Sequence, residues 1–121
     1  MDIDRFKNKL RTTGVLINKV SGGDAQNLKP RHLFIDDEFI YWTEDGKTER
    51  DHIRSVLKDD VTVVSEGYIT YSEYITIETS NARRPKVILF VQDKQTFEFL
   101  VKVLAEIMEN NRVNAGSSIK M

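Results

Sequence analysis

The sequence predicts a mainly β fold, in which a seven-stranded sandwich or barrel is capped by one C-terminal α-helix and preceded by a short N-terminal helix. Short segments rich in branched and aromatic residues recur at the 8–12-residue spacing that is typical of such sheets. One long apolar stripe of helical period follows them. A chain of 121 residues builds a single hydrophobic core, so we expect one domain.

Turn signals bound the expected strands. An Asp-Gly pair within residues 44–47 is a hairpin signal between two extended runs. Residues 21–27, rich in Gly, Asp and Asn, are expected to form a mobile loop, and Pro30 to confine the next ladder to the residues after it. The strands are expected at residues 14–20, 31–35, 39–43, 51–55, 61–65, 74–79 and 86–92, with a further candidate at 67–71.

Two segments have the periodicity of an amphipathic helix. Ile3, Phe6 and Leu10 predict a short helix over residues 2–10. Asp93 is a favourable N-cap for the closing helix. The apolar stripe of this helix consists of Phe97, Leu100, Val101, Leu104, Ile107 and Met108. We therefore divide the chain into an N-terminal helix or extension (1–13), the β-rich domain (14–110) and a frayed, flexible tail (111–121).

Composition excludes several functions. The chain lacks cysteine, which removes disulfides, thiol catalysis and thiolate metal sites. His32 and His52 lie on separate segments without a nucleophile or carboxylate at a suggestive spacing, so we expect no enzyme, no metal and no cofactor. A net charge of −1 provides no global field toward nucleic acid. No apolar run reaches the roughly 20 residues of a membrane-spanning helix.

Short motifs recur along the chain in a fixed order: Gly14-x-x-Ile17-x-Lys19-Val20, Lys29-x-Arg31-x-Leu33-x-Ile35, Ile40-x-Trp42, Val61-x-x-Val64-x-x-Gly67 and the helical segment 100–108. Together with the order of seven strands and one closing helix, they make the chain resemble the pleckstrin homology (PH) superfold, and most closely the PH domain of δ-type phospholipases C. The resemblance extends from about Asp4 to Asn110. One departure is the Trp that this family carries near the start of its closing helix, where the present chain has Leu100, or Phe97 or Phe99 in another register.

The resemblance implies that the loops after the first, third and sixth strands surround one open end of the sheet. Lys and Arg side chains bind phosphate through charge-assisted hydrogen bonds. We therefore expect a pocket for an anionic lipid headgroup, a phosphoinositide or phosphatidic acid, that recruits a monomeric cytoplasmic protein to the membrane periphery. Eight of the 18 basic residues would gather at this end: Lys19, Lys29, Arg31, Lys47, Arg50, Arg83, Arg84 and Lys86. The acidic residues of the same loops, which oppose this charge, are Asp24, Glu44, Asp45, Glu49 and Asp51.

The alternative is a PH-like scaffold that binds a protein partner and no lipid. The superfold offers a groove between an exposed strand edge and the closing helix, where a peptide can dock. Tyr68, Tyr71 and Tyr74 cluster in one stretch and suit an interface, although such residues are more often ordinary members of strand faces. PH-like scaffolds of the apicomplexan inner membrane complex exemplify this alternative, and the acylated PH proteins of the same parasites exemplify a lipid-binding domain that has a second anchor.

Overall fold

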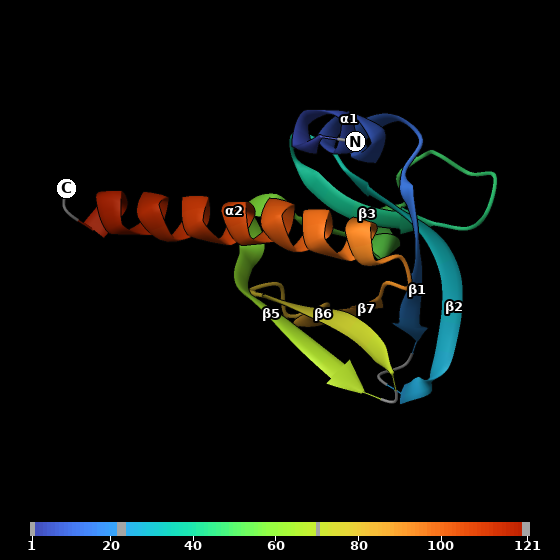
Figure 1. The fold of residues 1–121 in the computed structure, drawn as a ribbon. Coiled ribbons are helices and arrows are strands. Elements are labelled where there is room, and N and C mark those ends of the chain that lie inside the picture. The colour runs from blue at the N-terminus through green and yellow to red at the C-terminus, as the bar shows by residue number, and fades with distance from the viewer. Residues whose placement is uncertain (1, 22–23, 70, 120–121) are drawn as a thin grey trace.

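The computed structural model describes residues 2–21, 24–69 and 71–119, which form one antiparallel seven-stranded sheet that coils around the start of a long helix (Figure 1). The strand order is β4-β3-β2-β1-β7-β6-β5. The predicted fold class is therefore confirmed. The elements in chain order are α1 (Ile3–Thr12), β1 (Val15–Ser21), β2 (Asp24–Ile35), β3 (Phe39–Thr43), η1 (His52–Arg54), β4 (Ser55–Leu57), η2 (Lys58–Asp60), β5 (Val61–Ile69), β6 (Ser72–Thr79), β7 (Lys86–Phe90) and α2 (Lys94–Ile119).

The two halves of the sheet meet at β1. This strand pairs with β2 along its whole length and with β7 through Asn18 opposite Phe90 and Lys19 opposite Leu89. Because alternate residues of a strand face the same side, Val15 and Ile17 point into the core and Lys19 follows them on that side.

The closing helix fills the space inside the coiled sheet. Leu100 and Leu104 have no exposed surface, and Phe97 is almost fully buried. Leu100 thus fills the core where the PH resemblance led us to expect a Trp. The N-terminal helix joins the same core through Phe6 and Leu10, and the ring of Phe6 stacks on Phe99 with 5.3 Å between centroids.

The prediction of a loop at residues 21–27 is wrong outside residues 22–23, which lie beyond the described part of the chain. Ser21 still belongs to β1 and pairs with Asp24, the first residue of β2. The pairing of Val20 with Leu28 and of Ser21 with Asp24 extends the β1–β2 ladder through this polar stretch, with an irregularity between Val20 and Ser21, despite its turn-like composition. Pro30 also lies within β2, contrary to prediction. The ladder with β3 begins only at His32, so β2 is an edge strand at Pro30, where proline is tolerated.

Two other strand boundaries differ from those predicted. The expected strand at 51–55 is a 3-10 turn followed by the short strand β4, because the Asp51 carboxylate accepts a hydrogen bond from the backbone N–H of Ile53 and caps the turn. The candidates 61–65 and 67–69 form one strand, β5. Gly67 does not interrupt it, because the Tyr74 ring of β6 covers the backbone at this position.

The closing helix begins as predicted, with the Asp93 carboxylate accepting hydrogen bonds from the backbone N–H and hydroxyl of Thr96 at 2.8 and 2.7 Å. It continues to Ile119, whereas we expected it to end near Asn110, and its last turns project beyond the sheet (Figure 1). Residues 111–119 are therefore helical rather than an irregular tail. None of the described helices is long and apolar enough to span a membrane.

The turn from α1 into β1 depends on Gly14. Its φ of 76° lies in the left-handed region, and its backbone N–H donates to the Lys9 carbonyl at 2.8 Å, which ends the helix. A Cβ at Gly14 would also press against the Phe34 ring. We expect Gly14→Ala to lower the free energy of unfolding by about 2–3 kcal/mol, measured by urea denaturation.

Gly46→Ala is the matched control. Gly46 has a similar φ of 79° but no neighbour within reach of a new Cβ, so only the backbone strain of about 1 kcal/mol applies. An equal loss of stability in both variants would contradict the predicted clash with Phe34.

Candidate functional site

At one end of the sheet the inward-facing rows of β1 and β2 change from apolar to basic residues. Lys19 follows Ile17 on the core side of β1, and Arg31 precedes Leu33 on the core side of β2. Together with Arg54 and Arg84 from η1 and the β6–β7 turn, these side chains form what we call the basic cluster. Three distant parts of the chain therefore contribute to one positively charged site.

The ring of Trp42 lies beneath two members of the basic cluster. The Lys19 Nζ lies 5.0 Å and the Arg84 guanidinium carbon 4.9 Å from the ring centroid, and Trp42 itself is buried. Arg84 also donates a hydrogen bond of 2.7 Å to the Ile53 carbonyl, which holds the β6–β7 turn against η1. Trp42 is thus both a core residue and a platform for cations.

Burial and like charge both act on the basic cluster. Burial, followed by the charges of Arg84 and Arg31, lowers the pKa of Lys19 to about 8. Burial and the charge of Arg54 lower the pKa of Arg84. Among the side chains that the structure describes, no carboxylate forms an ion pair with Lys19, Arg31 or Arg84. A bound anion would relieve this repulsion.

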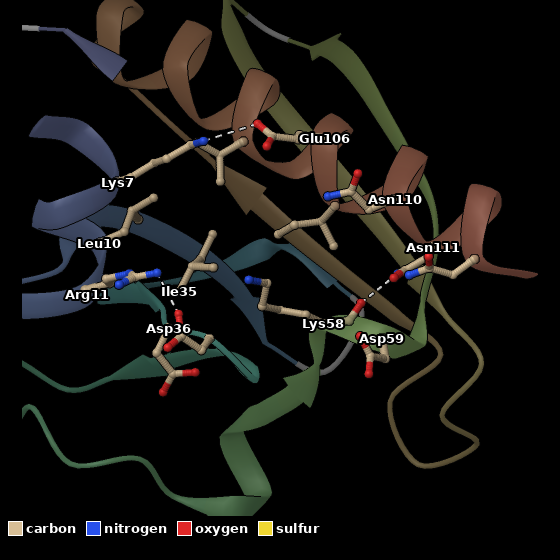
Figure 2. Close-up of a pocket in the computed structure, with 14 residues that line it drawn as sticks. Lys7, Leu10, Arg11, Ile35, Asp36, Lys58, Asp59, Glu106, Asn110 and Asn111 are labelled. Carbon is tan, nitrogen blue, oxygen red and sulfur yellow. Dashed lines mark hydrogen bonds and ion pairs between the residues drawn. The ribbon is translucent and has the colours of Figure 1, made fainter. Parts of the chain in front are cut away.

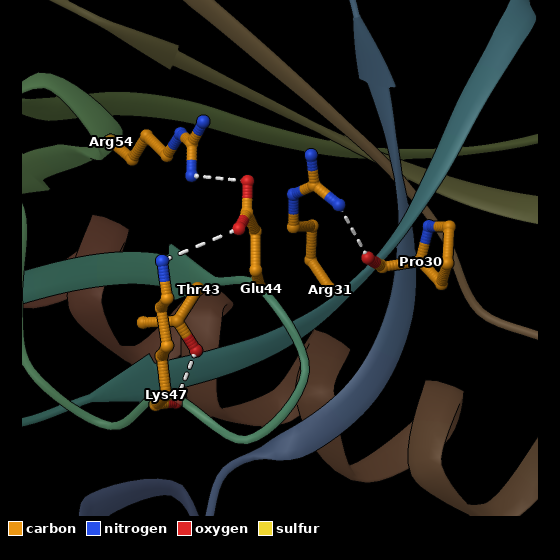
Figure 3. Close-up of polar contacts among 6 residues, drawn as sticks. All are labelled: Pro30, Arg31, Thr43, Glu44, Lys47 and Arg54. Atoms are coloured by element: carbon orange, nitrogen blue, oxygen red, sulfur yellow. Dashed lines mark hydrogen bonds and ion pairs between the residues drawn. The ribbon is translucent and has the colours of Figure 1, made fainter.

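Glu44 at the end of β3 is the acidic residue beside the cluster (Figure 3). Its carboxylate accepts from Arg54 at 3.3 Å and from Lys47 at 3.5 Å, and the charge of Lys47 followed by these hydrogen bonds lowers the pKa of Glu44. Figure 3 shows Arg31 on the other side of Glu44, where its guanidinium donates to the Pro30 carbonyl at 2.8 Å. Glu44 is therefore already paired with two cations and leaves Arg31 without a carboxylate partner among the described side chains.

Five of the eight predicted site residues lie in or beside this cluster. Lys19, Arg31 and Arg84 belong to it. Lys29 is exposed and lies opposite Lys19 in the β1–β2 ladder. Lys47 is connected to the cluster through its ion pair with Glu44.

The other three predicted residues lie elsewhere. The Arg50 guanidinium lies 3.8 Å from the centroid of the Phe39 ring, on the face of β3 opposite to Trp42. Lys86 lies opposite Glu78 on the outward side of β7, and Arg83 is exposed in the β6–β7 turn. The candidate site therefore consists of the basic cluster with the neighbouring Lys29 and Lys47, and not of all eight predicted residues.

Arg54 was missed by the sequence analysis, and Trp42 entered it only through the Ile40-x-Trp42 motif. Arg54 ends the 3-10 turn η1 and reaches the cluster through its ion pair with Glu44 at 3.3 Å. The sequence offers no usable signal for this placement, because strand alternation over residues 51–55 does not apply to a 3-10 turn.

A separate groove of about 330 Å³ lies between α1, η2 and α2 (Figure 2). Its floor is apolar, and two ion pairs cross its rim: Lys7 with Glu106 at 3.3 Å and Arg11 with Asp37 at 2.6 Å. None of the lining residues belongs to the basic cluster. We interpret the groove as the seam along which the two helices dock.

The two histidines lie in different elements, His32 in β2 and His52 in η1. The His32 Nδ1 lies 3.9 Å from an Asp45 carboxylate oxygen, and the side chain of His52 lies outside the description. Across the described residues, no three His, Asp or Glu side chains gather closely enough to hold a metal ion.

Comparison with solved structures identifies the fold as PH-like. Inner Membrane Complex Sub-compartment Protein 3 from Toxoplasma gondii superposes with a TM-score of 0.66 at 16% identity, over 91% of this chain and 85% of that one. The PH domain from TgAPH gives a TM-score of 0.62 at 11% identity, over 88% of each chain. No protein-family model and no curated protein matches the sequence. The narrower resemblance to δ-type phospholipases C remains a prediction from sequence motifs.

The depressed pKa of Lys19 gives a testable effect on stability. Below pH 8 the charged side chain is held in a partly desolvated, positive site, so folding is disfavoured relative to a neutral residue. Between pH 8 and 10.5 the folded state loses this proton while the unfolded state keeps it, so stability rises with pH. Lys19→Met should therefore raise the free energy of unfolding at pH 7 by on the order of 1 kcal/mol after allowance for solvent screening.

Urea denaturation at pH 7 and pH 10 measures this difference, which should shrink at the higher pH. Lys29→Met, at the exposed neighbouring position, should change stability by less than about 0.5 kcal/mol at both pH values. A constant difference between wild type and Lys19→Met across this range would contradict the assignment.

Proposed function

We propose that this domain is a binding module rather than an enzyme, and that its basic cluster binds the phosphate of an anionic phospholipid headgroup. Phosphoinositides and phosphatidic acid are the candidate lipids, because both present a phosphate that Arg and Lys can contact through several hydrogen bonds. Binding would recruit the protein to the cytoplasmic face of a membrane as a peripheral protein. The PH-like fold supports this class of function without specifying the ligand.

The observation that carries the proposal is the convergence of Lys19 and Arg84 over the Trp42 ring, with Arg31 close enough to repel Lys19. None of the three has a carboxylate partner among the described side chains. Surface lysines and arginines that only solvate a protein extend into water. Here burial lowers the pKa of Lys19 and Arg84, so holding both charges opposes folding in the absence of an anion. A phosphate at this position would offset that penalty.

The expected affinity is modest. Each basic residue close to an anionic membrane contributes on the order of 1 kcal/mol. A single headgroup site of this kind gives reversible contact, so stable attachment would need a second anchor or a partner.

Vesicle co-sedimentation tests the proposal. Vesicles of phosphatidylcholine with phosphatidic acid, a single phosphoinositide or phosphatidylserine distinguish the lipid classes. The double variant Lys19→Met/Arg31→Gln should bind the preferred lipid roughly tenfold more weakly, because it removes two of the converging cations. A soluble inositol polyphosphate should also alter the fluorescence of Trp42, the single tryptophan.

Arg50→Gln/Lys86→Gln is the matched control, since it removes the same net charge from positions outside the cluster. Nonspecific attraction would weaken both double variants equally, and that result would refute a defined pocket. Indifference of the wild type to every anionic vesicle would refute lipid binding altogether.

Binding should also depend on pH. An anion favours the protonated form of Lys19, whose pKa is about 8 in the free domain, so affinity should fall between pH 7 and pH 9. Lys19→Met should retain weaker binding with a flatter pH profile. An identical pH profile in wild type and variant would exclude Lys19 as a contact of the headgroup.

A second candidate is a protein-binding scaffold. It is favoured by β5, a nine-residue strand at the edge of the sheet that packs beside α2 and exposes Val63. Such an edge can accept an extended peptide as an added strand. This candidate predicts that the domain ignores all vesicles, so the co-sedimentation assay separates the two functions.

A further inference from the structure

The turn between β5 and β6 concentrates exposed apolar side chains. Tyr68, Ile69 and Tyr71 are exposed by 64, 51 and 92%. Isolated exposed apolar residues are ordinary on protein surfaces. Three such residues within four positions at the tip of one hairpin form a local feature that needs a separate explanation.

Tyr71 occupies a position that costs backbone energy. Its φ of 65° makes it the one non-glycine residue in the left-handed region among the described residues. Glycine or asparagine would adopt this conformation more easily. A tyrosine that is both strained and almost wholly exposed contributes little to folding, and such outliers are typical of functional positions.

The hairpin that carries this tip is firmly attached to the sheet. Gly67 pairs with Tyr74, and Ile69 with Ser72, at the end of the β5–β6 ladder. The Tyr74 ring packs on Phe90 with 5.3 Å between centroids and covers the backbone of Gly67. Tyr74 is therefore structural, whereas Tyr68 and Tyr71 are presented to solvent on a fixed support.

The chemistry of the tip suits the interfacial layer of a membrane. Residues 67–72 carry no charged side chain. Tyrosine combines an apolar ring with a hydroxyl and is enriched at the level of lipid headgroups. The carboxylate of Glu66 is set back from the tip, because Glu66 lies three residues before Ile69, about 10 Å along an extended strand. Glu73 lies opposite Tyr68 and limits how deeply the tip can enter an anionic surface.

The position of the tip is compatible with membrane contact by the β1–β2 hairpin. Figure 1 shows the end of β5 and the start of β2 at the same end of the molecule, opposite α1. The β1–β2 hairpin carries Lys19, Lys29 and Arg31, and also the exposed Leu28.

We propose that Tyr68, Ile69 and Tyr71 form a shallow wedge that enters the headgroup layer of an anionic membrane while the basic cluster holds a lipid phosphate. This inference rests on the proposed function, to which it adds a second, apolar point of contact. The wedge supplies attachment that does not depend on the identity of the headgroup.

The absence of cysteine allows a single environment-sensitive fluorophore to be placed at will. Tyr71→Cys carries the fluorophore NBD at the tip, and Val113→Cys carries it at an exposed position on α2 as the control. Vesicles of phosphatidylcholine with phosphatidic acid should shift the emission at position 71 to the blue and leave position 113 unchanged. Vesicles of phosphatidylcholine alone should produce a smaller shift.

A second measurement separates binding from folding. Tyr68→Ser/Tyr71→Gly should bind these vesicles about tenfold more weakly while its melting temperature stays equal or rises, because glycine relieves the backbone strain. Glu73→Gln should strengthen binding to anionic vesicles, whereas Glu98→Gln on the exposed face of α2 should not.

The outcomes distinguish the two proposals. If the protein sediments with anionic vesicles but the label at position 71 remains in water, the wedge is wrong and headgroup binding stands. If no anionic vesicle is bound, both proposals fail. If the label shifts without vesicles as protein concentration rises, the tip contacts a second copy of the chain and the wedge is again refuted.

Discussion

The burial of the α2 apolar stripe inside the coiled sheet is the contact on which the rest of the structure depends. Leu100 and Leu104 belong to the same core cluster as residues from both halves of the sheet. Among the described residues, these halves pair at two positions between β1 and β7. Full burial of one such leucine stabilises the fold by about 2 kcal/mol. The helix therefore joins two halves that their own hydrogen bonds would connect weakly.

The helix α2 fills only part of the space inside the coiled sheet, so side chains of the strands and turns close the remaining end. Trp42 fills that end, and Lys19 and Arg84 cover its ring. The cations of the basic cluster are thus fixed by packing and by the hydrogen bond from Arg84 to Ile53 rather than by flexible loops. Side chains that are already fixed lose little conformational entropy when a ligand binds, so such a site would favour affinity for a small anion. The same arrangement explains why the unliganded domain holds its charges against burial and repulsion.

Periodicity predicted the fold well because it reports which residues face the core. The stripe from Phe97 to Ile107 and the alternation in β6 both correspond to buried rows. Predictions failed where tertiary pairing overrides local composition, as at residues 24–27 and around Gly67. The candidate site was harder still. Arg50 and Arg54 lie in one short segment, yet Arg50 contacts the Phe39 ring and Arg54 pairs with Glu44 beside the basic cluster, and the 3-10 turn that places Arg54 was not predicted.

The tyrosines of residues 66–78 illustrate the same limit. Composition groups Tyr68, Tyr71 and Tyr74 together, whereas the hairpin places their side chains in different environments. Tyr74 folds back over Gly67, and the other two project from the tip. A pattern of residue types cannot distinguish a side chain that stabilises a turn from one that the turn presents.

The docking of α1 has a geometric consequence for any anchor attached before it. Phe6 stacks on Phe99 and Lys7 pairs with Glu106, so α1 is held against α2, opposite the end of β5 and the start of β2 (Figure 1). A globular domain of 121 residues is about 35 Å across. In the proposed orientation, with Tyr68, Ile69 and Tyr71 at the membrane, a tether leaving the N-terminal end of α1 would need about ten extended residues to reach the same bilayer. A shorter tether would instead join two membranes or tilt the domain onto its side.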